Sequence, residues 1–229
     1  MKDNAEIAYE VVKEKIFSQE FRAGQKLREE MLVGILEMSR TPIRTALNNL
    51  AHDGLVTIVP KRYCMVKQYT KEEIEQIGVA RLSLDLISTN LAIYYGSNAE
   101  MYRLLKLCDM QEQAVNDRND ILRRKIDCDF HLEITKISKN GFLYDMQKSL
   151  YLRVRHILST NDADKLDRYA SVNSHREIVE AMLVRDRGKA LKLVREHLCN
   201  YYQFDAENEL FDFYTVDLQQ NDSRKEKQT

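Results

Sequence analysis

The chain has 229 residues, enough for two ordinary domains, and its 35 Lys and Arg residues nearly balance its 36 Asp and Glu residues. Because the net charge is only −1, bulk charge does not support nucleic-acid binding, which would need local clusters of Arg and Lys. Only two Pro and seven Gly residues occur, so the fold is predicted to be mainly α.

Membrane and disulfide-rich proteins are disfavoured by the sequence pattern. The start lacks a cationic segment followed by an apolar one, and no uncharged run reaches the roughly 18 residues that a membrane helix needs. We therefore expect a cytoplasmic protein with no membrane partner. The four cysteines form no C-x-x-C pair, which argues against a zinc ribbon or a disulfide framework and favours reduced, buried thiols.

Three helices are predicted in the first 50 residues. Residues 5–20 place apolar side chains on one helical face, and Gly24 breaks this segment. Residues 28–36 and 38–50 then predict a helix, a turn and a second helix. A second helix of this kind is free to enter the major groove of DNA.

The helix of residues 38–50 has one apolar and one polar face. Ile43 and Leu47 recur at helical spacing, whereas Arg40 and Arg44 fall on the other side or at the start. Ser39 is suited to cap the helix, whose first turn offers N–H donors and a positive dipole end to a phosphate.

A short hairpin is predicted after the helix stop at residues 52–54. Residues 55–69 alternate β-branched and other apolar side chains around residues 60–62. Lys61 and Arg62 would lie at the tip of this two-stranded wing, where they could reach phosphates or a minor groove. Three helices and a wing make a winged helix-turn-helix domain, which we assign to residues 1–68.

These motifs resemble the GntR superfamily of bacterial transcription regulators. The resemblance is carried by AGQKL (23–27), SRTPIRTAL (39–47) and LxxDGLV (50–56). It implies that Arg40 and Arg44 contact DNA, with Ser39 and Thr41 assisting near phosphates. Two positions depart from the family pattern: Tyr63 stands where the wing usually has Gly, and Glu30 stands where one branch has Arg.

The second region is predicted to be an all-helical antiparallel bundle, with a possible helix cap at Thr70. Apolar stripes and Gly or Asn breaks divide it into six helices with these approximate bounds: 71–95, 99–116, 120–138, 142–160, 164–185 and 187–208. We assign residues 69–215 to this domain. Residues 216–229 are polar without an apolar stripe, so we expect them to be disordered.

Four residues of the bundle form a candidate metal site. Asp127 and His131 are four residues apart and share one helical face, while His175 and His197 fall on the last two helices, where antiparallel neighbours could bring both inward. Three imidazoles and a carboxylate suit zinc, with nickel, manganese or iron as alternatives. Spacing alone also fits a simple ion pair on the helix surface.

The sequence around these residues resembles the FCD group of GntR regulators, whose effector domain is an all-helical bundle. The matching segments are DCDFH (127–131), HREIVEA (175–181) and REHL (195–198). The resemblance implies that Asp127, His131, His175 and His197 bind a divalent metal. It also implies a small organic acid as effector, bound by the metal and nearby basic or polar side chains.

Three residues are candidates for contacting this carboxylate. Arg81 resembles a basic residue that faces the cavity from the first bundle helix, although Asp85 stands where the family usually has Glu. Arg155 follows an apolar face, and Asn173 precedes His175 by about half a turn. For Arg155 and Asn173, a surface ion pair or a helix cap is the alternative role.

The sequence therefore predicts a ligand-responsive repressor that binds a palindromic double-stranded operator as a homodimer. Two alternatives use the same metal site. A metal-dependent hydrolase would also need a general base or nucleophile, and no motif supplies one, so we do not expect an enzyme. A regulator that senses the metal itself would respond to chelation without any organic ligand.

Overall fold

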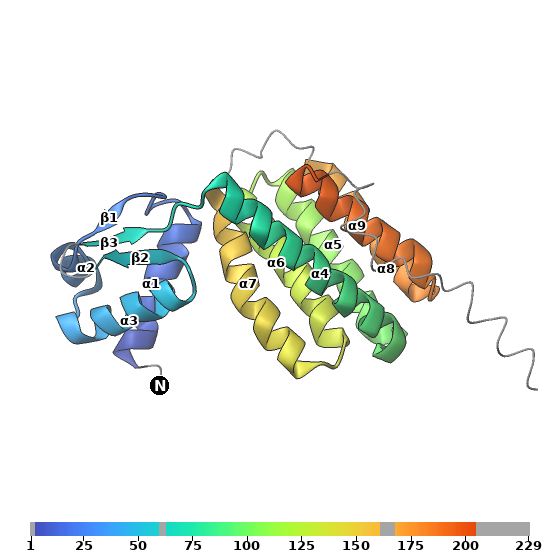
Figure 1. Ribbon diagram of the computed structural model, residues 1–229, viewed down its shortest axis with the longest axis horizontal. Coiled ribbons are helices and arrows are strands. Elements are labelled where there is room, and N and C mark those ends of the chain that lie inside the picture. The colour runs from blue at the N-terminus through green and yellow to red at the C-terminus, as the bar shows by residue number, and fades with distance from the viewer. Residues whose placement is uncertain (1–2, 60–62, 161–167, 205–229) are drawn as a thin grey trace, which may run out of the picture.

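The computed structural model describes residues 3–59, 63–160 and 168–204, which form a small N-terminal module and a larger helical bundle (Figure 1). The predicted wing tip, the predicted disordered tail and the predicted start of the fifth bundle helix lie outside these residues. Within them, no helix is both long and apolar enough to span a membrane.

The N-terminal module is a winged helix-turn-helix, as predicted. Its elements in chain order are α1 (Asn4–Phe17), β1 (Lys26–Leu27), α2 (Glu29–Leu36), α3 (Arg40–His52), β2 (Val56–Val59) and β3 (Tyr63–Val66). β3 lies between β1 and β2 and is antiparallel to both. The prediction contained only two strands. β1 adds the third because Gly24, at φ +78°, turns the chain so that its N–H donates to the Val66 carbonyl at 3.0 Å.

The core of this module is built mainly by α1 and α3, which pack against each other. Its buried apolar residues include Val12, Ile16, Phe17, Leu32, Ile43, Leu47, Leu50 and Leu55. Burying this face of α3 leaves Arg40, Thr41 and Arg44 exposed on the other face. Ser39 precedes α3 in an extended conformation and is its N-cap residue, as predicted, so the helix begins at Arg40.

The bundle contains α4 (Lys71–Tyr95), α5 (Asn98–Asn116), α6 (Asp120–Ile137), α7 (Gly141–Thr160), α8 (Arg168–Leu183) and α9 (Arg187–Tyr202). Thr70 and Ser97 each cap a helix through a capping box with a Glu three residues later. α9 ends at Tyr202 because Gln203 adopts a left-handed conformation, φ 56°. The predicted end at residue 208 lies beyond the described residues.

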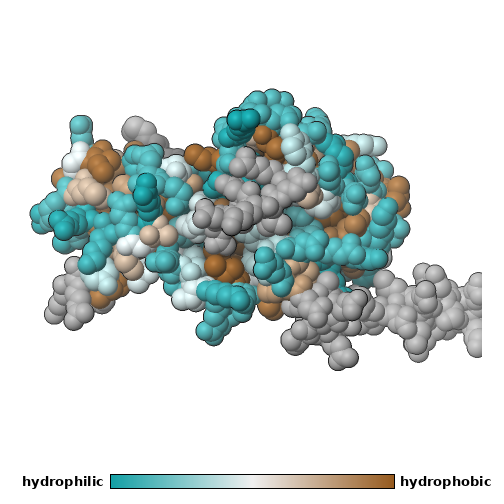
Figure 2. All heavy atoms as spheres, turned by 90° about the horizontal axis from the view of Figure 1, so that it is seen from above, coloured by the Kyte–Doolittle hydropathy of each residue, from teal (hydrophilic) through white to brown (hydrophobic). Residues whose placement is uncertain are grey.

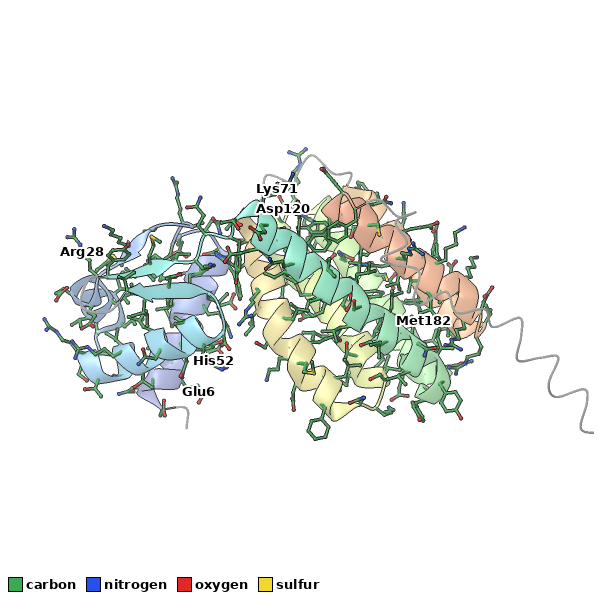
Figure 3. All side chains as sticks on the ribbon, in the orientation of Figure 1. Glu6, Arg28, His52, Lys71, Asp120 and Met182 are labelled. Carbon is green, nitrogen blue, oxygen red and sulfur yellow. The ribbon has the colours of Figure 1, made fainter. Side chains whose placement is uncertain are left out.

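α6 occupies the middle of the bundle, where it packs against α4, α5 and α7, while α8 and α9 cover α5 and α4 (Figure 1). Side chains fill the space between the ribbons, and Met182 of α8 is one of those that are fully buried (Figure 3). Hydrophilic residues cover most of the face seen in Figure 2, with small separate apolar patches. All four cysteines are free and buried, as expected.

α1 contacts the bundle through α7. Arg155 of α7 donates two hydrogen bonds to the Glu14 carboxylate, at 3.3 and 3.1 Å, and its guanidinium lies 4.1 Å from the ring centroid of Phe17. Gln19, just after α1, donates to the Ser159 hydroxyl at 3.0 Å. The contact therefore combines charge, a cation–π interaction and a neutral hydrogen bond.

Two further side chains of α7 hold backbone carbonyls of the N-terminal module. Arg153 donates to the carbonyls of Asp53 and His52, at 3.2 and 3.1 Å, at the end of α3. His156, which is fully buried, lies with its Nε2 2.6 Å from the Lys67 carbonyl at the junction of the two domains. One helix of the bundle thus contacts the N-terminal module at α1, at the end of α3 and after the wing.

Candidate metal centre and DNA-reading face

Three histidines from different helices meet inside the bundle, as the sequence predicted. His131 of α6, His175 of α8 and His197 of α9 each offer one ring nitrogen, and these atoms all lie within 4.8 Å of one another. His175 is fully buried and stacks on Phe130 with ring centroids 4.1 Å apart. Packing against Phe130 thus holds the imidazole of His175 in place.

The hydrogen bonds of His175 and His197 determine which nitrogen of each ring carries the proton. His175 Nδ1 lies 2.9 Å from Gln111 Oε1, an acceptor, so this nitrogen donates. His197 Nδ1 lies 2.7 Å from Ser174 Oγ, whose own proton is donated to the Ser171 carbonyl, so this nitrogen also donates. Both Nε2 atoms therefore present lone pairs, and they are only 3.2 Å apart. Two such lone pairs repel unless a cation lies between them.

His131 adds a third lone pair of the same kind. Its Nδ1 lies 3.1 Å from Asp85 Oδ2, and its buried Nε2 has no hydrogen-bond partner among the described residues. Burial lowers the pKa of His175 to about 3 and that of His197 well below its usual value, so both rings stay neutral at pH 7. Three imidazoles whose ring nitrogens converge fit a first-row divalent ion.

Asp127, the fourth predicted ligand, borders the three histidines but lies outside the set whose ligand atoms meet. Its Oδ1 is 3.7 Å from His175 Nε2 and accepts hydrogen bonds from Gln111 and Ser171, both at 3.2 Å. Its Oδ2 lies 3.6 Å from Arg81 Nη2. Burial favours the neutral acid, but the neighbouring His175 and Arg81 hold the pKa of Asp127 well below its usual value. The carboxylate is therefore ionised and is the nearest anionic group to His175.

Asp85 connects the histidines to α7. Besides His131, its carboxylate accepts hydrogen bonds from Tyr151, at 2.6 Å, and from Gln147, at 2.7 Å. All four side chains are buried. Gln147 and Tyr151 were not predicted as site residues. Their only sequence signal is a pair of polar side chains four residues apart on the inner face of a helix, the same spacing as Arg81 and Asp85.

Arg81 lies in this network, where only 1% of its surface is exposed. Its Nε donates to the Tyr151 hydroxyl at 3.1 Å, and its charge is balanced by Asp85 and Asp127, each with an oxygen 3.6 Å from a guanidinium nitrogen. That distance is too long for a hydrogen bond, and Nη2 has no partner among the described residues. Arg81 thus keeps one unused donor beside the histidines.

The structure does not bring the other two predicted effector contacts to this site. Arg155 instead holds Glu14 at the domain contact, because position 155 lies one helical turn beyond Tyr151 along α7, where the helix meets α1. Asn173 is exposed, because residues two apart on a helix point in nearly opposite directions and His175 faces inward. Neither side chain therefore lies beside the histidines.

The predicted DNA contacts lie on the exposed face of the N-terminal module. Ser39, Arg40, Thr41 and Arg44 are all exposed at the start of α3, and the Ser39 side chain makes no cap hydrogen bond in the described structure, which leaves its hydroxyl for a partner. Glu29 and Glu30 of α2 each pair with one of the two arginines. Lys61 and Arg62 fall outside the described residues.

Two family models match the chain: "Bacterial regulatory proteins, gntR family" over residues 4–66 and "FCD domain" over residues 76–200. The HTH-type transcriptional repressor GlaR of Escherichia coli (strain K12) is 26% identical over 203 residues, which are 83% of this chain and 90% of GlaR. The uncharacterized HTH-type transcriptional regulator YdhC of Bacillus subtilis (strain 168) is 23% identical, over 87% of this chain and 88% of YdhC.

Solved structures share the fold over nearly the whole chain. A putative GntR transcriptional regulator from Rhodococcus sp. RHA1 superposes with a TM-score of 0.77 at 19% identity, covering 87% of this chain and 95% of that one. McbR/YncC of E. coli superposes with a TM-score of 0.74 at 20% identity, covering 90% and 100%. The FCD match alone spans more than half of the sequence. The chain therefore belongs to the GntR family of bacterial regulatory proteins, as a transcription regulator with an N-terminal DNA-binding helix-turn-helix and a C-terminal FCD domain.

Proposed function

We propose that this regulator is a metal-dependent repressor that a small carboxylate releases from DNA. A divalent ion, zinc in the first instance, would bind to the three histidines, with Asp127 as the fourth ligand. The carboxylate effector would bind to that ion and to Arg81. The observation that supports this most strongly is the convergence of three imidazole Nε2 lone pairs beside a buried arginine with an unused donor.

The ion's ligands would be held by partners that the chain already supplies. Each Nδ1–H of the three histidines donates to an acceptor, namely Asp85, Gln111 or Ser174. Such bonds fix the ring orientation and make the other nitrogen a better ligand. When bound, the ion would supply a positive charge to which a carboxylate can coordinate.

Arg81 supports an organic acid as the second occupant. A guanidinium binds a carboxylate through two parallel hydrogen bonds, and it stays charged even when buried. Arg81 Nη2 lies 3.6 Å from Asp127 Oδ2, and the guanidinium is held by Tyr151, whose hydroxyl accepts a hydrogen bond from Nε. A small carboxylate at this point would accept a hydrogen bond from Arg81 Nη2 and would also occupy an open coordination position of the ion.

α7 is the element that would carry occupancy to the DNA-binding domain. Tyr151 and Gln147 contact Asp85, which contacts the metal-facing His131, while Arg153 and Arg155 of the same helix hold the winged helix-turn-helix. A rotation or shift of α7 would move both sets together. Regulation requires the effector to have different affinities for the two positions of α7.

On the output side, a homodimer would place two copies of α3 in major grooves about 34 Å apart, so the operator would be a palindrome. Arg40 and Arg44 would read base edges, and Ser39 and Thr41 would contact phosphates. GlaR is named a repressor, and this supports repression as the direction of control. The exposed polar face of α3 is the surface that fits these contacts.

The test combines metal analysis with operator binding. The purified wild type should contain one divalent ion per chain, and a panel of small organic acids should include one that both raises the melting temperature and weakens binding to a duplex selected from a random pool. Chelation that by itself abolishes operator binding, with no acid having any effect, would favour a metal sensor instead. A chain that neither contains nor takes up a divalent ion would refute the proposal.

A further inference from the structure

We infer that Glu29 is a positioning residue for DNA reading: its carboxylate holds the guanidinium of Arg44 by the inner nitrogen Nε and leaves the outer edge, Nη1 and Nη2, to face a base pair. The inference rests on the proposed role of Arg44 in base contact. It adds a residue of α2, outside the recognition helix, that determines how sharply α3 discriminates between sequences.

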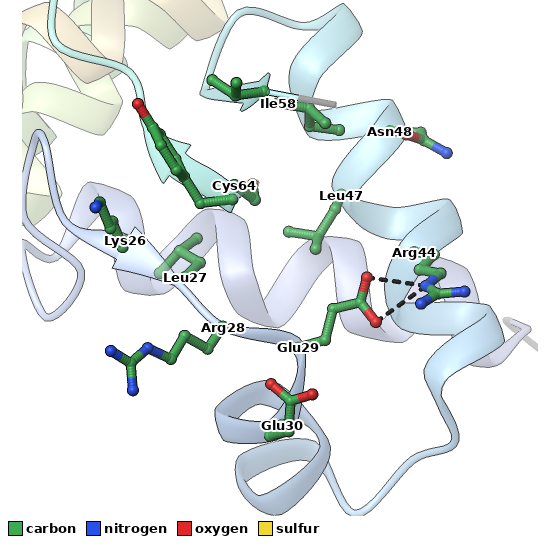
Figure 4. Close-up of a pocket in the computed structure, with 12 residues that line it drawn as sticks. Lys26, Leu27, Arg28, Glu29, Glu30, Arg44, Leu47, Asn48, Ile58 and Cys64 are labelled. Atoms are coloured by element: carbon green, nitrogen blue, oxygen red, sulfur yellow. Dashed lines mark hydrogen bonds and ion pairs between the residues drawn. The ribbon is translucent and has the colours of Figure 1, made fainter. Parts of the chain in front are cut away.

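The contact joins both carboxylate oxygens of Glu29 to one nitrogen of Arg44. Arg44 Nε lies 2.8 Å from Glu29 Oε1 and 3.0 Å from Oε2, so both carboxylate oxygens accept from the same N–H (Figure 4). The pair joins α2 to α3 across 15 positions of sequence. The hydrogen bond from Arg44 lowers the pKa of Glu29, so the carboxylate is ionised at neutral pH. Among the described residues, Nη1 and Nη2 of Arg44 have no hydrogen-bond acceptor.

The remaining edge of the guanidinium is suited to a base. Arginine has five donors in a rigid plane, and two parallel N–H groups match the two acceptors on the major-groove edge of guanine. With Nε engaged by Glu29, only the Nη1–Nη2 edge is free to make such a pair. The side chain of Arg44 is 61% exposed and that of Glu29 only 30%. Approaching DNA would therefore meet the guanidinium of Arg44 rather than the carboxylate of Glu29.

Glu29 lines a groove together with basic, apolar and polar side chains and with one other carboxylate, that of Glu30. The groove has a volume of about 590 Å³ and separates the start of α2 from α3 and the wing strands, with Lys26 and Arg28 on one side and Leu47 and Ile58 on the other (Figure 4). Arg28 is exposed and points away from the module (Figure 3). A carboxylate at this place repels the phosphate backbone of approaching DNA, so it weakens general binding. Its compensating effect is to orient Arg44.

The neighbouring ion pair, Arg40 with Glu30, lacks this double contact. Arg40 Nη2 lies 3.2 Å from a single oxygen of Glu30, and the two side chains are 59% and 71% exposed. Exposed pairs of this kind are worth little and leave both side chains mobile. Glu29 and Glu30 have equal charge and adjacent positions, but only Glu29 restrains its arginine at two points.

The alternative is that Glu29 shields Arg44, so that their ion pair must break before DNA binds. The two models predict opposite changes in specificity. A positioning carboxylate reduces the rotamer freedom that Arg44 loses on reading a base, so its removal lowers specific binding relative to non-specific binding, by about tenfold if a good part of the arginine side-chain entropy is involved. A shield competes with DNA, so its removal strengthens specific binding.

The experiment measures the ratio of dissociation constants for a scrambled duplex and for the duplex that the full-length wild type selects from a random pool, at one fixed salt concentration. Arg44→Ala is measured first. A large fall in the ratio supports base reading by Arg44, whereas an unchanged ratio refutes that part of the proposed function and the inference with it.

The Glu29 variants then test the inference alone. We expect Glu29→Ala to lower the ratio about tenfold and Glu29→Gln, which keeps one amide acceptor, to lower it by about half as much on a logarithmic scale. Glu29→Ala added to Arg44→Ala should cause no further loss, because the interaction is already gone. Thermal melting checks that each variant folds, and Glu29→Gln stands in if Glu29→Ala does not.

Glu37→Gln is the matched control for charge. Glu37 follows α2 and is exposed, so its substitution removes one negative charge from the same helix-turn-helix without touching the Arg44 contact. It should tighten binding to both duplexes alike and leave the ratio unchanged. If Glu29→Ala behaves like Glu37→Gln, or raises the ratio by tightening binding to the selected duplex, Glu29 does not position Arg44.

Discussion

Substitution of His175 by Ala tests the metal site at its most buried donor. The change removes one of three converging Nε2 atoms and leaves a small cavity where the ring stacks on Phe130. If the ion binds only the folded chain, an ion concentration 100-fold above its dissociation constant stabilises the fold by about 2.7 kcal/mol. For a chain of this size, that corresponds to a rise in melting temperature of roughly 5–11 °C.

The assay is the difference between melting temperatures with and without added zinc, measured for each variant, together with the metal content per chain. His175→Ala should melt lower than the wild type even without metal, because of the cavity. The decisive quantity is the zinc-dependent increment, which should fall towards zero. Comparing each variant with itself separates loss of the ion from loss of packing.

His156→Ala is the control for a buried histidine. His156 is also fully buried, but it faces the domain junction, where its Nε2 contacts the Lys67 carbonyl. Its loss should lower the melting temperature while the zinc-dependent increment and the metal content stay at the wild-type values. If His175→Ala also keeps the wild-type increment and one ion per chain, our ligand assignment is wrong.

Three further predictions address the domain contact, the thiols and the buried charges. Arg155→Ala should weaken the contact with α1 by about 1 kcal/mol, seen as roughly fivefold faster hydrogen exchange at the end of α1 with no change in α8. Burial raises the pKa of Cys64 to about 11 and that of Cys108 to about 12; both thiols are therefore protonated at pH 8, and iodoacetamide should label them only after unfolding. Asp85→Asn leaves the Arg81 charge less compensated and should lower the free energy of unfolding by about 3–5 kcal/mol in urea titrations, whereas an effect within ±0.5 kcal/mol would mean that the network does not stabilise the fold.

Local signals explain which parts of the fold could be predicted. The bounds of α4 agree with the prediction at both ends because a Thr cap precedes it and Gly96 follows it, and both are short-range features. β1 was missed because two residues, Lys26–Leu27, contain no alternation, and their pairing with β3 depends on a long-range contact. Helix and hairpin patterns are visible in the sequence, but an added edge strand of this length is not.

The same limit applies to the site, because contacts between helices cannot be predicted from local sequence patterns. Convergence of the histidines was predicted because their helices and inward faces follow from periodicity, with the family resemblance naming the ligands. Gln147 and Tyr151 were missed because their roles depend on which helix lies opposite Asp85, and periodicity does not say this. Helical phase alone, however, does place the exposed Asn173 on another side of α8 than His175, and this could have been inferred from the sequence.

The balance of buried charge couples binding of the metal to binding of the effector. Besides the histidines, which bind a metal only as neutral imidazoles, the site holds one buried cation, Arg81, and two buried carboxylates, Asp85 and Asp127. Without an ion, it therefore carries one net negative charge and repels an anionic ligand, whereas a divalent ion makes it net positive by one. A single carboxylate then brings the buried charge to neutral, the state with the least desolvation cost. Affinity for an organic acid should therefore disappear when the ion is removed, and acids with one carboxylate should bind more tightly than those that bury a second charge.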